Sequence, residues 1–355
     1  MKKSLFFIFL FFIILSTTFY GVNNNYAFAE QYYYTYDVEH LFFHCLIAYP
    51  EIAFTPNNPV KKSYLNDCIT PLEFCRVLDS LYKNNYVLVS ICDCFYVENN
   101  IAYKQKIKVP CGKKAIILSF DDVNYDSKKI GYGMVDKIIL DNKGDIATQT
   151  KLKDKIDVSY NREFLPILEN FIKSHPDFSY NGARGTINLT GYDGILGYRT
   201  SHTNTSKQKD LEITIAKNVV TKLKSLGWTF ACHSYGHYHM KKISDEKFKQ
   251  EITNWKNEVK PLIGKTNIYV YPYGEWEVFK NGDYSQKHKM LLDNGFNLFC
   301  GVGMKTFYSY LPNNSGKKVL FMDRKVVDGT TLRSNNQYLK PFFSPTEIID
   351  SLRPL

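Results

Sequence analysis

The sequence predicts an α/β protein whose core is an irregular parallel (β/α)7-type barrel, with a polar insertion at residues 125–156. Short apolar runs rich in β-branched residues alternate about seven times with segments of helical spacing, and such alternation is typical of parallel sheets and barrels. Each run is short and lies between polar flanks, as expected for a strand buried on both faces. No linker, repeat or low-complexity block interrupts the chain, so residues 30–355 are expected to form one domain.

The N-terminus predicts export. Lys2 and Lys3 precede an almost continuous apolar stretch, and Ala27-Phe28-Ala29 is a small-x-small cleavage site, so residues 1–29 are interpreted as a secretory signal peptide. The alternative is an uncleaved membrane anchor, although the apolar stretch is nearer a dozen residues than the ~20 that a spanning helix needs. Either way, the rest of the chain is expected to be secreted or associated with the cell surface.

The charge of the chain suggests its surroundings only weakly. Removing Lys2 and Lys3 lowers the net charge from +10 to +8, without a long basic run in what remains. This bias fits anionic surroundings such as a cell wall or membrane surface, and it fits an ordinary basic soluble surface equally well. Nucleic acid is not suggested, and the sequence does not predict an oligomeric state.

The eight cysteines do not define a disulfide framework, because eight cysteines permit 105 full pairings and a chain of this length needs no staples. Cys92 and Cys94 are two residues apart in a predicted strand, so their side chains are expected to point to the same face.

The first half of the chain begins with a βαβ pattern. Residues 39–48 and 86–92 are predicted strands, and between them residues 70–83 form a helix with Pro71 in its first turn. The pattern resumes with a strand at residues 115–120. The insertion that follows has no sustained period and contains at most one hairpin, around Lys143-Gly144.

The second half repeats the unit of helix followed by strand. A helix begins at Phe164 and ends before His175-Pro176, and another ends at Gly227, a good left-handed terminator. Ser344-Pro345-Thr346-Glu347 reads as a capping box that opens the last helix. The remaining predicted helices and strands are residues 185–190, 210–226, 228–232, 245–259, 268–271, 286–294, 297–302 and 319–326.

Two groups of polar residues directly follow buried strands. Asp121 and Asp122 end one strand, and His233 and His237 follow another, at the strand edge where parallel α/β folds hold their chemistry. Two histidines and one carboxylate leave coordination positions open, which is the catalytic pattern of metal sites. The second carboxylate then remains to act as a base, and Ser234 can fix the turn between the histidines. Taken singly, an Asp-Asp pair is usually a solvated loop start, and such a histidine pair is usually on a surface helix.

Three segments resemble motifs of the polysaccharide deacetylase (NodB-homology) family, carbohydrate esterase family four. They are Ser119-Phe120-Asp121-Asp122, His233-Ser234-Tyr235-Gly236-His237 and Tyr271-Pro272-Tyr273-Gly274. The resemblance implies that Asp121 is the general base and that Asp122, His233 and His237 hold a divalent metal, usually zinc. It also implies that the backbone N–H of Tyr273 helps to hold the oxyanion.

The motif that usually supplies the general acid is missing near residue 320, but Leu41-Phe42-Phe43-His44 ends the first predicted strand. In this respect the chain resembles the circularly permuted branch that deacetylates poly-N-acetylglucosamine, which implies that His44 is the general acid. The alternative is a buried structural histidine.

Two departures from the family motifs leave the partner of the base unassigned. Val123 replaces a glycine, and Val270 stands where the third motif has an arginine. Arg324, in a late strand, could supply that charge from another position, or it could be an ordinary surface arginine. Residues 190–200 form a loop rich in Gly and Tyr that either stacks on sugars or is a plain turn, and Trp276 either walls a subsite or packs internally.

The sequence therefore predicts an exported, metal-dependent de-N-acetylase that acts on N-acetylglucosamine units of a surface or cell-wall glycan. Two alternatives remain: a catalytically silent glycan-binding protein on the same fold, and an O-acetyl esterase that uses the same metal site.

Overall fold

The computed structural model describes residues 31–303 and 308–354, so the predicted signal peptide at residues 1–29 lies outside the described residues. Residues Tyr32–Leu355 form one compact unit. Within the described ranges, no helix has both the length and the apolar character needed to cross a bilayer.

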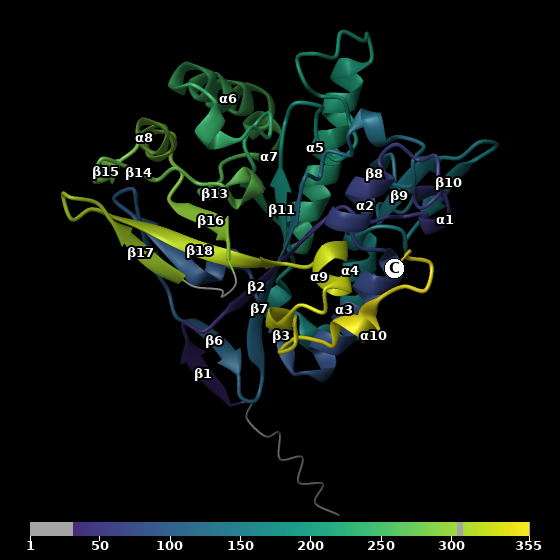
Figure 1. The fold of residues 1–355 in the computed structure, drawn as a ribbon, viewed down its shortest axis with the longest axis horizontal. Coiled ribbons are helices and arrows are strands. Elements are labelled where there is room, and N and C mark those ends of the chain that lie inside the picture. Colours follow the sequence, from purple (N-terminus) through teal and green to yellow (C-terminus); the bar gives the residue numbers. More distant parts are fainter. Residues whose placement is uncertain (1–30, 304–307, 355) are drawn as a thin grey trace, which may run out of the picture. The chain divides into compact units, whose positions relative to one another are not determined.

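Seven parallel strands of the described chain close into a barrel, which confirms the predicted fold class (Figure 1). The ring closes because β18 pairs with β2 and β7 pairs with β11, while β3 (Tyr86–Leu88) pairs with the beginning of β7. In order around the ring, the strands are β2 (Glu39–His44), β7 (Lys114–Asp121), β11 (Thr186–Leu189), β12 (Thr229–Cys232), β13 (Ile268–Val270), β16 (Leu298–Val302) and β18 (Lys318–Val326).

Helices pack around the barrel, and the predicted boundaries of the longer ones are confirmed to within one or two residues. Thr70 and Glu73 form a reciprocal capping box at the start of α3, and Gly227 ends α5 with φ 104°. The described helices are α1 (Pro50–Ala53), α2 (Lys61–Asp67), α3 (Pro71–Lys83), α4 (Phe164–Ser174), α5 (Lys209–Leu226), α6 (Asp245–Glu258), α7 (Lys260–Ile263), α8 (Gln286–Asp293), α9 (Gly329–Arg333) and α10 (Pro345–Ile348).

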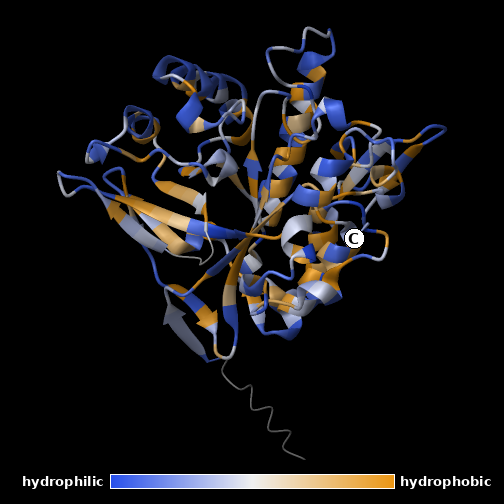
Figure 2. Ribbon diagram, viewed as in Figure 1, coloured by the Kyte–Doolittle hydropathy of each residue, from blue (hydrophilic) through white to orange (hydrophobic). Residues whose placement is uncertain are grey.

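Alternation along the barrel strands separates two apolar clusters. Figure 2 shows the hydrophobic stretches of these strands in orange. On β7, Ile116 and Leu118 belong to the outer cluster, which the helices cover, whereas Ala115 and Ile117 belong to the cluster that fills the barrel. Because side chains alternate with a period of two, the residues at 119 and 121 also point inward. The strand pattern therefore delivers Asp121 to the carboxyl end of the barrel interior.

The polar insertion is more regular than the sequence predicts. The hairpin around Lys143-Gly144 is confirmed between β8 (Lys137–Leu140) and β9 (Ile146–Lys151), but β10 (Ile156–Ser159) adds a third antiparallel strand. Its apolar residues Ile156 and Val158 are exposed, and Asp157 and Ser159 between them are half-buried. Other small antiparallel pairs are β1 (Tyr32–Thr35) with β6 (Ile107–Pro110), β4 (Phe95–Glu98) with β5 (Ile101–Lys104), β14 (Phe279–Lys280) with β15 (Asp283–Tyr284), and β17 (Tyr308–Pro312) with β18.

Some local predictions are wrong. The strand predicted at residues 86–92 ends at Leu88, because the Ser90 hydroxyl accepts a bond from the Cys92 N–H and starts a single 3-10 turn. Cys92 is consequently exposed while Cys94 is buried, so the two do not share a face. Ser344 makes no capping bond, and α10 is only one turn long. None of the eight cysteines, all of which lie in the described residues, is in a disulfide.

Candidate active site

A pocket of about 470 Å³ lies at the carboxyl ends of the barrel strands. Six of the seven predicted site residues line it, and they come from segments far apart in the sequence. They are His44, Asp121, Asp122, His233, His237 and Tyr273. The seventh, Arg324, is fully buried beside the pocket and contacts Asp121.

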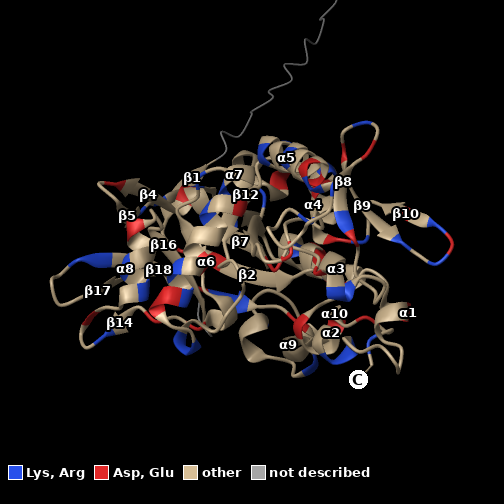
Figure 3. Ribbon diagram, turned by 90° about the horizontal axis from the view of Figure 1, so that it is seen from above, with Lys and Arg blue, Asp and Glu red and all other residues tan. Residues whose placement is uncertain are grey.

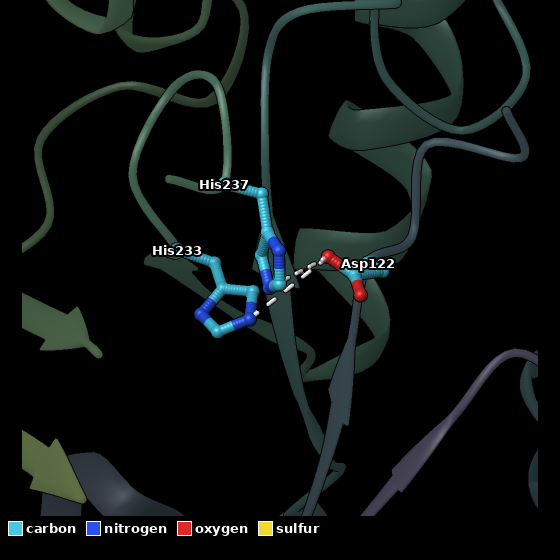
Figure 4. A group of neighbouring side chains, drawn as sticks. All are labelled: Asp122, His233 and His237. Atoms are coloured by element: carbon cyan, nitrogen blue, oxygen red, sulfur yellow. Dashed lines mark ion pairs between the residues drawn. The ribbon is translucent and has the colours of Figure 1, made fainter. Parts of the chain in front are cut away.

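Three of these side chains form a group that could hold a metal ion (Figure 4). One potential ligand atom from each of Asp122, His233 and His237 lies within 4.8 Å of the others. Oδ1 of Asp122 is 3.9 Å from Nε2 of His233 and 3.6 Å from Nε2 of His237. Separations of this size suit ligands arranged around one ion rather than groups bonded directly to each other.

The surrounding backbone prepares both histidines for coordination. Nδ1 of His233 is 2.9 Å from the Val270 carbonyl, to which it donates its proton, so the Nε2 lone pair faces Asp122. His237 donates its backbone N–H to the Ser234 hydroxyl at 3.0 Å, which fixes the turn as the sequence suggests. Burial lowers the pKa of His237 to about 4, which keeps the imidazole neutral, as a ligand must be. The donor set therefore fits a divalent cation.

Strained backbone accompanies this arrangement. Asp122, Ser234, His237 and Tyr273 all have φ between 53° and 60°, a region that residues other than glycine rarely adopt. Such conformations persist only where the surroundings enforce them, and they concentrate at functional sites. Each of the three site segments thus has a distorted residue at the pocket.

Arg324 takes the place of the missing arginine beside Asp121. Its Nη1 and Nη2 donate to Oδ1 and Oδ2 of Asp121 at 2.8 and 3.0 Å, a two-pronged ion pair. Arg324 is 0% exposed, so it is not a surface arginine. Burial raises the pKa of Asp121, but the charge of Arg324 and its hydrogen bonds to the carboxylate outweigh burial and hold the pKa below its ordinary value. Asp121 therefore stays a carboxylate, the form that accepts a proton.

Asn188 also contacts Asp121, and our reading of the sequence missed it. Its Nδ2 donates to Oδ1 of Asp121 at 2.6 Å, and the residue is 0% exposed. The sequence does offer one signal for it. Asn188 is a single amide between apolar neighbours in the strand predicted at residues 185–190, and a buried polar side chain needs a hydrogen-bond partner. Together, Asn188 and Arg324 fix the plane of the Asp121 carboxylate.

His44 lies next to Asp121 across the β2 and β7 pair. Its Nδ1 is 2.9 Å from the Asp67 carbonyl, which holds a proton on that nitrogen and leaves Nε2 for a substrate. The ring is partly exposed in the pocket, unlike a buried structural histidine.

The two segments suggested as sugar contacts do not line the pocket. Residues 190–200 instead pack behind the first motif, where Leu196 and Gly197 donate backbone bonds to the carbonyls of Val123 and Asn124. Trp276 is 38% exposed, and its ring centroid is 5.5 Å from that of Phe321. The exposed aromatic side chain at the pocket is Tyr273, which stacks on His239 at 3.9 Å.

Comparison with known proteins agrees with this site. Residues 197–287, which include His233, His237 and Tyr273, match the family model for polysaccharide deacetylase. No curated protein has a significant match to this chain.

Solved structures with similarity to this chain include three deacetylases. The Streptococcus pyogenes deacetylase PplD in complex with acetate has 14% identity and a TM-score of 0.41, over 84% of this chain and 96% of that one. The polysaccharide deacetylase BC0361 from Bacillus cereus has 12% identity and a TM-score of 0.47, over 87% and 70%. The BpsB deacetylase domain from Bordetella bronchiseptica has 13% identity and a TM-score of 0.29, over 62% and 73%.

The matched segment supplies two of the three candidate metal ligands, and the barrel brings the Asp121-Asp122 motif against them. Over residues 197–287, the chain is therefore similar to the polysaccharide deacetylase family.

Proposed function

We propose that this protein is an exported, metal-dependent de-N-acetylase that removes acetyl groups from N-acetylglucosamine units of a surface or cell-wall glycan. The observation on which the proposal depends is the arrangement around Asp121. An ionised base, paired with Arg324, lies against a group of three metal-binding side chains in one open pocket.

The residues divide the chemistry of amide hydrolysis among them. Asp122, His233 and His237 would hold a divalent cation, most simply zinc, and the cation would act as a Lewis acid toward the amide carbonyl and the attacking water. Asp121 takes the proton from the attacking water, and the backbone N–H of Tyr273 donates to the oxygen that gains negative charge. His44, protonated on Nε2, gives a proton to the departing amine.

Export is proposed from the sequence alone. The basic start, the apolar stretch and the Ala27-Phe28-Ala29 site support a secreted or surface-bound protein. Lys and Arg positions are interspersed with Asp and Glu positions along the ribbon in Figure 3. The circular permutation stays a prediction, supported by the position of His44 on the first barrel strand.

The test is acetate release from N-acetylglucosamine oligomers by the purified protein, before and after chelation, together with metal analysis. We expect release that chelation abolishes and that zinc restores. Asp121→Asn should abolish release while oligomer binding survives. If wild type and variant both bind oligomers without releasing acetate, the protein is a silent glycan-binding protein. Acetate from acetylated xylan but none from the oligomers would make it an O-acetyl esterase.

A further inference from the structure

A buried chain of polar side chains lies below Asp121, inside the barrel. His40 on β2 and Ser119 on β7 are each 1% exposed, and neither is among the residues that line the pocket. Nε2 of His40 is 2.9 Å from the Ser119 hydroxyl, which in turn lies 3.2 Å from Nη1 of Arg324. The chain continues through Arg324 to Asp121.

The donors and acceptors in this chain allow a continuous arrangement of protons. A guanidinium can only donate, so the Ser119 oxygen accepts from Arg324, and its own hydrogen can point to Nε2 of His40. In this arrangement His40 is neutral with its proton on Nδ1, which faces the sulfur of Met322 at 3.2 Å. Burial, followed by the charge of Arg324, lowers the pKa of His40 well below its ordinary value, in agreement with a neutral ring.

We propose that His40 and Ser119 are positioning residues that hold the Arg324 guanidinium in the plane of the Asp121 carboxylate. This inference rests on the proposed function, because it assigns the two residues to the orientation of the proposed base.

The need for such support follows from the path of the arginine side chain. Arg324 starts on β18 and reaches Asp121 on β7, with β2 between the two strands. It passes 4.1 Å from the centroid of the Phe42 ring, and its Nε donates to the Gly301 carbonyl at 3.3 Å. The Ser119 hydroxyl accepts from Nη1, the nitrogen that also donates to Oδ1 of Asp121, and so gives the guanidinium a further anchor from inside the barrel.

The kinetic test compares Ser119→Ala and His40→Leu with the wild type, loaded with zinc, on N-acetylglucosamine oligomers. A base misplaced by about 1 Å costs on the order of 100-fold in rate, so we expect kcat to fall between 10- and 100-fold while KM stays within about twofold. His40→Gln offers an acceptor near the place of Nε2 and should recover most of the lost kcat.

Thr186→Val is the matched control for Ser119→Ala. Thr186 pairs with Ser119 across β7 and β11 and is 2% exposed, but its hydroxyl has no partner in the described structure. We expect this variant to keep the wild-type kcat. Bound zinc and Tm should stay near wild type in all four variants. The proposal fails if Ser119→Ala and His40→Leu lower Tm but leave kcat unchanged.

A second measurement does not depend on turnover. In metal-free protein labelled with 15N-histidine, the proposal requires a neutral His40 with its proton on Nδ1, and His40→Gln identifies the signal. A proton on Nε2, or a doubly protonated ring near neutral pH, would overturn it. If the wild type releases no acetate, the proposed function fails, and the form of His40 still decides whether the chain is built as described.

Discussion

At the scale of single residues, the arginine that pairs with Asp121 is Arg324 on β18. The third family motif would place an arginine at Val270 on β13 instead. The strand registers align Val270 with Cys300, and Cys300 with Met322. Arg324 is therefore one inward position closer to the carboxyl end of the barrel than Val270. Because every strand of a closed barrel faces the same interior, a guanidinium from β18 reaches Asp121 as well as one from β13 would.

Replacing Arg324 tests whether an arginine on β18 serves Asp121 in this way. Arg324→Ala leaves the Asp121 carboxylate buried without its strongest partner, and breaking a buried pair costs about 3–5 kcal/mol. We expect that loss of unfolding free energy in urea, and a fall in kcat on the order of 100-fold. Arg324→Lys keeps the charge but not the two-pronged geometry, so it should recover stability better than kcat. Equal recovery of both would show that the geometry is unimportant.

The turn between the two histidines supports a second prediction. The Ser234 hydroxyl accepts the His237 N–H at 3.0 Å in a segment where both residues have positive φ. Ser234→Ala removes that bond without touching a metal ligand, and losing support of this kind typically weakens metal binding about 10- to 100-fold. Zinc titration by calorimetry measures the change, with the exposed Ser225→Ala as control. An affinity equal to wild type would show that the turn holds without the hydroxyl.

The candidate site was predictable where its residues are adjacent in sequence. Asp121-Asp122 and the His233 to His237 segment each contain a local pattern, so the sequence alone locates the candidate metal ligands. Asn188, Ser119 and His40 follow no such pattern, because their roles depend on which strands are neighbours and on which side chains point inward. For the same reason, the sequence could not decide whether Arg324 pairs with Asp121 or is an ordinary surface arginine.

At the scale of helices and strands, the boundaries that the sequence predicts well are those with a capping residue or a terminating glycine. The helix at Pro71–Lys83 begins at a capping box and the helix at Lys209–Leu226 ends at a left-handed glycine, signals that the sequence displays. The predicted strand extended too far because Ile91 and Cys92 continue the apolar run of β3, although they belong to the 3-10 turn at Ile91–Cys94. The signals against a longer strand are Ser90 and Asp93, and two isolated polar residues are a weak signal.

The start of α4 makes a pH-dependent contribution to stability. Glu163 is 0% exposed and accepts the backbone N–H groups of Leu46 and Phe164. Burial raises its pKa from 4.5 to about 8, although those two bonds lower it somewhat. Between these values the folded protein keeps a proton that the unfolded chain releases, so unfolding free energy falls as pH rises from about 4.5 to about 8. The contribution is on the order of 5 kcal/mol, because the pKa differs by about 3.5 units and each unit is worth about 1.4 kcal/mol.

Urea unfolding of metal-free protein at pH 5 and pH 8 measures this contribution. Glu163→Gln has no proton to release, so its unfolding free energy should change less between the two pH values than that of wild type. Glu347→Gln, at an exposed position on α10, should behave like wild type. A wild-type slope in Glu163→Gln would assign the pH dependence to other groups.

At the scale of the whole molecule, the end of the chain fastens the first βα unit. Arg353 donates to both carboxylate oxygens of Glu73 at 2.7 and 2.6 Å, and both side chains are fully buried. It also donates to the carbonyls of Leu65 and Cys68, which flank Asp67. Because the Asp67 carbonyl holds His44, the last residues support the candidate general acid from the opposite end of the sequence.

Arg353→Ala should therefore destabilise the protein by about 3–5 kcal/mol, because it leaves Glu73 charged, buried and without its partner. Replacing both residues, as in Glu73→Met with Arg353→Met, removes the unpaired charge and should cost less than Arg353→Ala alone. Asp283→Asn breaks an exposed pair with Lys289 and should cost no more than about 1 kcal/mol. Urea unfolding of the three variants gives these differences. If the double variant is instead less stable than Arg353→Ala, the buried pair itself contributes net stability. That contribution would hold the C-terminal segment against α3.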